Sequence, residues 1–158
     1  MATLDEIEDQ EKIWRIEPGL GPSEQYYRML YASPQFLNWL ERQLKNEPKD
    51  RHRNISPYEQ VNQLFYEFVC GSQMVYDENM KKLKPLGSNV WEMKTTDVRI
   101  FGYFYRTAKF IAVCGEMKKR LRRSRAYDPF KAEVGNFMNH VDLNPPKAMR
   151  EDNLNALL

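Results

Sequence analysis

The stretch VWEMKTTDVRIFGYFYRTAKFIAVCG, residues 90–115, decides the fold of this 158-residue chain. It holds three short runs rich in β-branched and aromatic residues, and polar residues separate them at positions 95–97 and 106–108. Runs of this kind, joined by short polar breaks, are typical of consecutive antiparallel strands. We therefore expect three antiparallel strands, in NVWEMKT, DVRIFGYFY and KFIAVCG.

Helix signals flank these strands on both sides. SPQF at position 33 and SPYE at position 56 each place a capping serine before a proline, and DPF at position 128 repeats the pattern with an aspartate. Apolar residues then recur at helical spacing. The sequence predicts an α+β fold, in which N-terminal helices pack on a small twisted antiparallel sheet and a C-terminal helix follows. The predicted core consists of Trp91, Ile100, Phe104, Ile111 and Val113, packed against Leu40, Leu64 and Phe68.

The composition indicates a globular protein, because 42% of the residues are apolar and 13% are aromatic. No apolar run is long enough to span a bilayer, and the first residues, MATLDEIEDQEKIW, are acidic where a signal peptide is basic. We therefore expect a cytoplasmic protein with no membrane partner. The two cysteines lie in apolar runs without CxxC spacing, so we expect no disulfide, no metal and no cofactor.

The net charge of +2 conceals an uneven distribution of charge. Residues 81–131 contain 14 lysines and arginines and 4 acidic residues, a net charge of +10, whereas the remainder carries −8. A basic block of this size indicates a phosphate backbone as partner, although a solvated basic surface is the alternative. We predict that RNA is bound by Lys82, Lys84, Lys118, Arg120, Arg122, Arg123 and Arg125.

Strand alternation gathers a second set of polar residues. Glu92 and Lys94 share one face of their strand, while Trp91 and Met93 share the other. Arg99 follows a tight turn and is expected to reach the face that holds Lys94. This exposed patch is either an ordinary polar surface with cross-strand ion pairs or part of a catalytic site.

The order of four segments, MKKLKPLGSNVWEMKT, DVRIFGYFYR, KFIAVCGEMKKR and AYDPFKAEV, resembles the RelE and HigB toxins of bacterial toxin–antitoxin modules, including their phage-derived relatives. The resemblance covers residues 56–141. It implies a small α+β domain and cleavage of mRNA in the ribosomal decoding site, with mRNA, the ribosome and a cognate antitoxin as partners. On this basis we divide the chain into an acidic N-terminal extension (1–32), a RelE/HigB-like domain (33–142) and a proline-containing tail (143–158).

The implied reaction is metal-independent attack of a 2′-OH on the adjacent phosphate. It requires a base, cations for the developing charge and an acid for the leaving oxygen. We expect Lys94 and Arg99 to stabilise the phosphorane, Glu92 to act as the base, and Lys119 to complete the catalytic set. Tyr127 is expected to stack on a base, or to donate a proton once neighbouring cations lower its pKa. The alternatives are an ion pair for Glu92 and simple packing for Tyr127.

Two other hypotheses remain open. A ParE-like protein of the same fold would inhibit DNA gyrase, or bind nucleic acid, without catalysis. The joint presence of Lys94, Arg99, Lys119 and Tyr127 favours the nuclease. The acidic segment at residues 5–11 either folds over the basic face and restrains it, or is solvated.

Overall fold

The computed structural model describes all 158 residues apart from the side chain of Ser124. The helices are α1 (Leu4–Asp9), α2 (Pro34–Arg42), α3 (Pro57–Val69), α4 (Asp128–His140) and α5 (Leu154–Leu157). The strands are β1 (Trp14–Ile16), β2 (Met29–Ala32), β3 (Met80–Lys82), β4 (Trp91–Lys94), β5 (Val98–Arg106) and β6 (Lys109–Met117). Short 3-10 helices are η1 (Leu44–Asn46), η2 (Leu86–Ser88), η3 (Lys118–Arg120) and η4 (Ser124–Tyr127).

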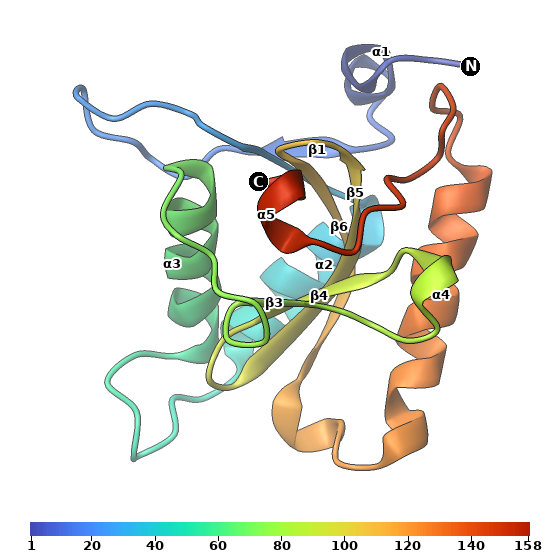
Figure 1. Cartoon of the computed structure of the whole chain (residues 1–158). Coiled ribbons are helices and arrows are strands. Elements are labelled where there is room, and N and C mark those ends of the chain that lie inside the picture. Colours follow the sequence, from blue (N-terminus) through green and yellow to red (C-terminus); the bar gives the residue numbers. More distant parts are fainter.

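The strands form one mixed sheet in the order β1-β2-β6-β5-β4-β3, which Figure 1 shows at the centre of the molecule. The α+β class and the three antiparallel strands β4, β5 and β6 are confirmed. The small antiparallel sheet is wrong, because β1 and β2 extend it on one side and β3 on the other, and β2 pairs with β6 in parallel. Parallel pairing joins distant segments without a hairpin turn, so no local sequence signal announces it.

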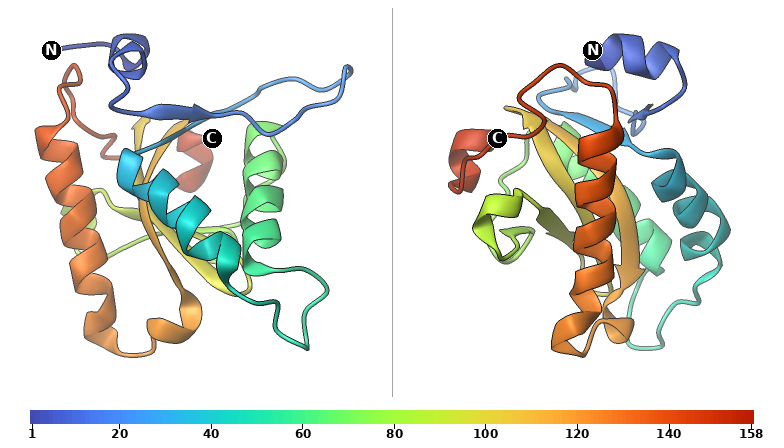
Figure 2. Two further views of the ribbon diagram at one scale, coloured as in Figure 1. Left: turned by 180° about the vertical axis from the view of Figure 1, so that it is seen from behind. Right: turned by 90° about the vertical axis from the view of Figure 1, so that its right-hand side faces the viewer.

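Helices cover both faces of this sheet, as the views in Figure 2 show. On one face α2 packs against β6 and α3 against β2 and β5, and Leu154 and Leu157 of α5 join the same buried cluster. On the other face α4 packs against β5 and β6, together with Leu4 and Ile7 of α1. Residues of the predicted N-terminal extension and tail therefore contribute strands and buried side chains to the sheet and its two cores.

The predicted core is partly confirmed. Trp91, Ile100 and Phe104 are buried in the cluster that contains the α2 and α3 residues Leu40, Leu64 and Phe68, as expected. The assignment of Ile111 and Val113 to that cluster is wrong, because both lie on the α4 face. β6 is apolar on both faces, so alternation of apolar and polar residues could not orient it.

Capping serines set the start of α2 and α3. The Ser33 hydroxyl accepts a hydrogen bond from the Phe36 amide at 3.1 Å and donates to the Val113 carbonyl at 2.7 Å. Ser56 accepts from the Glu59 amide at 3.2 Å. Asp128 does not cap α4, because η4 runs directly into the helix and Asp128 is its first residue. The capping serine of α2 thereby ties this helix to β6.

The acidic N-terminal segment does not restrain the basic run. α1 and the segment that follows β6 lie at opposite ends of the molecule in every view (Figures 1 and 2). The apolar side of α1 is buried on the α4 face of the sheet instead.

Gly102 allows β5 and β6 to approach closely at a register shift between Phe101 and Gly102. A Cβ at this position would lie 2.0 Å from the backbone oxygen of Ile111, which cannot move without breaking the ladder. Gly102→Ala is therefore expected to destabilise the protein by about 3 kcal/mol. Denaturant unfolding measures this, with Gly87→Ala as the control, because a Cβ at Gly87 meets open space. Equal stability of the two variants would contradict the close approach.

Candidate active site

The hairpin between β4 and β5 holds most of the predicted catalytic residues. Lys94 lies directly opposite Arg99 in the register, and Glu92 lies opposite Phe101. The connecting turn is fixed by Gln60 of α3, whose side-chain oxygen accepts from the Thr95 hydroxyl at 2.9 Å and from the Asp97 amide at 3.0 Å. The helix layer therefore sets the position of this end of the sheet.

Glu92 is a buried carboxyl group beside several cations. Only 4% of the residue is exposed, and its Oε2 finds no hydrogen-bond partner among the residues that the structure describes. Burial raises the pKa of Glu92, and the opposing effects of Arg99 and Lys94 do not cancel it. A buried carboxyl group with a raised pKa is suited to proton transfer near neutral pH. The predicted exposed patch is thus wrong for Glu92, which is enclosed.

Arg99 is also nearly enclosed, with 6% of the residue exposed. Its Nη1 donates to the Thr95 carbonyl at 2.6 Å and to the Val98 carbonyl at 2.9 Å, so the hairpin holds the guanidinium in place. Arg99 lines a pocket of about 550 Å³ whose other cations are Lys94 and Lys118. Three carboxylates, Glu67, Asp77 and Glu78, line the same pocket, and Lys94 is paired with Asp77. Arg99 and Lys118 form no ion pair among the described residues and can contact a phosphate.

Lys94 is held at the rim of this pocket by the turn before β3. Its ammonium donates to the carbonyl of Asp77 at 2.7 Å and to the Asp77 carboxylate at 3.1 Å. The hydrogen bond from Lys94 lowers the pKa of Asp77, which therefore stays ionised. Asp77 positions Lys94 and also neutralises part of its charge.

Tyr127 lies close to Glu92 and Arg99, because η4 brings the chain back over β5. Its ring meets that of Phe101 edge to face, with 5.6 Å between centroids. Burial and the charge of Glu92 raise the pKa of Tyr127, while Arg99 opposes the shift. The expectation that cations lower this pKa is therefore wrong. A hydroxyl with a raised pKa stays protonated and can donate a hydrogen bond, but it is a weaker proton donor than an ordinary tyrosine.

Lys119 is not part of this group. Its ammonium lies 3.8 Å from the Glu47 carboxylate and lines a second pocket on the side of the α2–α3 connection. Lys118, predicted to bind RNA, is the member of the basic run that lines the pocket with Arg99.

Lys82 is buried and does not belong to an RNA-binding surface. Only 2% of the residue is exposed. Its ammonium pairs with Asp152 and donates to the Glu151 carbonyl at 3.2 Å and to Asn89 at 3.3 Å. The predicted contact of Lys82 with RNA is wrong, because this lysine fixes the C-terminal segment. Lys84 is exposed, and its contact with RNA stays a prediction.

The basic run after β6 forms an exposed surface. All six of its cations are exposed, namely Lys118, Lys119, Arg120, Arg122, Arg123 and Arg125. Arg120 pairs with Glu47 at 2.8 Å and with Glu116 at 3.3 Å. Within the part of the chain that the structure describes, Arg122, Arg123 and Arg125 form no ion pair. Their charges are available to a polyanion.

Sequence reasoning missed Gln60 and Asp77. Gln60 carried a signal, since it is a polar residue on the otherwise apolar stripe of α3, four residues before Leu64. Asp77 carried none, because the loop before β3 gives no indication that it folds back onto Lys94.

Among the described residues, no three His, Cys, Asp or Glu side chains lie together in an arrangement that would hold a metal ion. None of the described helices has the length and apolarity needed to cross a membrane. Comparison with known proteins gives no match to any family model, curated protein or solved structure.

Proposed function

We propose that this chain is a cytoplasmic, ribosome-dependent mRNA-cleaving toxin of a toxin–antitoxin module, with mRNA, ribosomal RNA and a cognate antitoxin as partners. The observation that supports it best is the placement of a buried carboxyl group, Glu92, beside Tyr127 and Arg99, of which Arg99 also lines a pocket together with Lys94 and Lys118. The resemblance of the four sequence segments to RelE and HigB toxins supplies the reaction class.

The proposed reaction assigns one role to each group. The 2′-oxygen bonds to phosphorus while its proton passes to the Glu92 carboxylate. The bond between phosphorus and the 5′-oxygen breaks, and the leaving oxygen takes a proton from the Tyr127 hydroxyl. Glu92 then returns a proton to Tyr127, and the products are a 2′,3′-cyclic phosphate and a 5′-hydroxyl. Arg99, Lys94 and Lys118 stabilise the charge that develops on the phosphate oxygens.

We propose that cleavage requires the ribosome because the groups at the candidate site are enclosed. Glu92 and Arg99 expose 4% and 6% of their surface, so the scissile phosphate must be held in one orientation to reach them. A ribosome that holds the message in a fixed shape supplies this positioning, which contributes a large part of many rate enhancements.

A reconstituted translation reaction tests the proposal, with primer extension to map cuts in the message. We expect cuts in translated mRNA and few in the same RNA without ribosomes. A gyrase supercoiling assay runs beside it. Absence of cuts together with inhibited gyrase would instead favour the ParE-like function, and equal cutting of naked RNA would remove the requirement for the ribosome.

The exposed cations of the basic run are expected to bind RNA backbones through their charge. Replacing Arg123 and Arg125 with alanine should lower the slope of log affinity for ribosomes against log salt by about 1.4, since each lost contact contributes about 0.7 for single strands. Cosedimentation over a salt series measures the slope. Unchanged slopes would show that these arginines do not contact RNA.

A further inference from the structure

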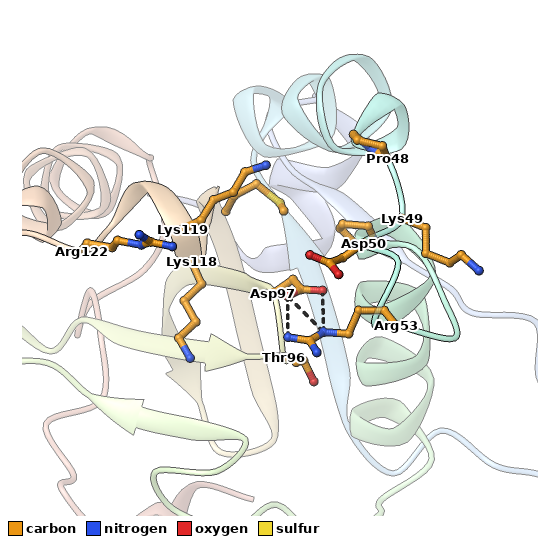
Figure 3. Close-up of a pocket in the computed structure, with 11 residues that line it drawn as sticks. Pro48, Lys49, Asp50, Arg53, Thr96, Asp97, Lys118, Lys119 and Arg122 are labelled. Carbon is orange, nitrogen blue, oxygen red and sulfur yellow. Dashed lines mark hydrogen bonds and ion pairs between the residues drawn. The ribbon is translucent and has the colours of Figure 1, made fainter.

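A second pocket, of about 430 Å³, lies beside the candidate active site (Figure 3). The residues after α2, the β4–β5 turn and the start of the basic run enclose it. Its charged lining residues are Lys49, Asp50, Arg53, Asp97, Lys118, Lys119 and Arg122. Five cations and two carboxylates thus line the pocket, and Pro48, Pro57 and Met117 supply apolar surface.

One of the two carboxylates is already neutralised. Asp97 accepts hydrogen bonds from Arg53 at 3.2 and 3.3 Å, which Figure 3 shows as dashed lines, and from Gln60 at 2.7 Å. Burial alone would raise the pKa of Asp97, but these hydrogen bonds outweigh it and lower the pKa. The pair also holds the Arg53 guanidinium in place at the pocket.

The other carboxylate, Asp50, accepts a hydrogen bond from the His52 amide at 2.8 Å and has no ion pair among the described residues. Lys119 and Arg122 reach the pocket from the basic run, while the Lys49 side chain points away from it in Figure 3. Lys119 is paired with Glu47 at 3.8 Å, whereas Lys118 and Arg122 form no ion pair among the described residues and can attract an anionic ligand. The negative charge of Asp50 opposes such a ligand.

The two pockets adjoin each other. Thr96 and Lys118 line both of them, so a nucleic-acid chain can pass from the pocket of Arg99 to this one along Lys118. Ordinary small-molecule sites have similar volumes, so each pocket has room for about one nucleotide.

We infer that the pocket of Arg53, Lys119 and Arg122 is a second nucleotide subsite, which binds the phosphate of a nucleotide adjacent to the scissile one in single-stranded RNA. This inference rests on the proposed function for the identity of the polyanion. It assigns Lys119 to RNA binding in place of catalysis. It also gives the connection between α2 and α3 a part in holding the message, through Arg53.

The test is binding of a fluorescent RNA of about six nucleotides with 2′-O-methyl sugars, which cannot be cleaved by the 2′-oxygen, measured by anisotropy over a salt series. The double variant Lys119→Ala with Arg122→Ala is expected to weaken binding about tenfold and to lower the salt slope by about 1.4. Asp50→Asn is expected to tighten binding about fivefold, because it removes a negative charge and keeps the oxygen that accepts from His52. The matched control is Lys12→Ala with Arg150→Ala, two exposed cations outside both pockets.

Three results together would support the subsite. RNA binding should be weaker in the double variant Lys119→Ala with Arg122→Ala, tighter in Asp50→Asn and unchanged in the control. Unchanged binding in the pocket variants, with weaker binding when Arg123 and Arg125 are replaced, would overturn the subsite and leave RNA binding intact. Failure of the unchanged protein to bind the RNA would also overturn it. Cleavage in the translation reaction would in that case still decide the proposed function separately.

Discussion

Replacement of Arg99 by alanine is expected to lower the rate of message cleavage on the ribosome by about 10² or more and to leave ribosome binding nearly unchanged. The guanidinium is almost enclosed, so it contributes little to the surface that meets the ribosome. It lies at the pocket, beside Glu92 and Tyr127, where charge develops in the proposed transition state. Single-turnover cleavage measures the rate, and cosedimentation measures ribosome binding.

Arg106→Ala is the matched control for this experiment. Arg106 lies on the same strand and also donates to backbone carbonyls, to Tyr105 at 2.6 Å and to Pro146 at 2.8 Å, but at the opposite end of β5. The Arg106→Ala replacement is expected to lower the stability by a similar amount and to leave the cleavage rate unchanged. Arg123→Ala is expected to do the reverse of Arg99→Ala, with weaker ribosome binding and an unchanged rate at saturation. A full cleavage rate in the Arg99 variant would exclude its role in the reaction.

Glu92→Gln is expected to lower cleavage by about 10² to 10⁴, the usual contribution of a general base, while raising stability at neutral pH. Burial raises the pKa of Glu92, so the folded protein holds its proton more tightly than the unfolded chain. As pH rises from the ordinary glutamate pKa, about 4.3, through the raised pKa, the folded state loses stability because it must ionise a buried group. A neutral glutamine does not ionise, so this loss is absent in the variant.

Thermal unfolding of both proteins from pH 4 to pH 8 checks this expectation. The variant is expected to melt higher at pH 7 by about 2 to 4 °C, the shift that about 1 kcal/mol produces in a chain of this size, and the difference should vanish near pH 4. Cleavage by the unchanged protein should fall as pH decreases through the raised pKa. A glutamine variant that is active, or that is less stable at pH 7, would contradict the role of a buried base.

Local sequence signals were enough to predict the parts of the fold that neighbouring residues determine. The β4–β5–β6 meander follows from three β-rich runs with short breaks, and α2 and α3 follow from a capping serine, a proline and an apolar stripe. β1, β2 and β3 are only three or four residues long. β2 pairs in parallel with β6, which lies far away in the sequence. Such pairing leaves no pattern within one segment.

The same distinction applies to the candidate site, where local sequence signals predict some features and tertiary contacts determine the others. Alternation and a tight turn were enough to predict that Arg99 reaches the face that holds Lys94, and the register places the two residues opposite each other. The burial of Glu92 and the raised pKa of Tyr127 depend on α4 and η4 covering that face, which is a tertiary effect. In the sequence, Lys82 and Lys119 cannot be distinguished from the other basic residues. In the structure Lys82 pairs with Asp152 and Lys119 with Glu47, and both partners are far away in the chain.

The most direct measurement of the central claim is cleavage of a translated message that carries a single 2′-deoxy sugar at a mapped cut. The proposed reaction uses the 2′-oxygen as the nucleophile, so the account predicts that this cut disappears while other cuts in the same message and ribosome binding persist. Products of the unmodified message should end in a 2′,3′-cyclic phosphate. An undiminished cut at the 2′-deoxy position would contradict the account.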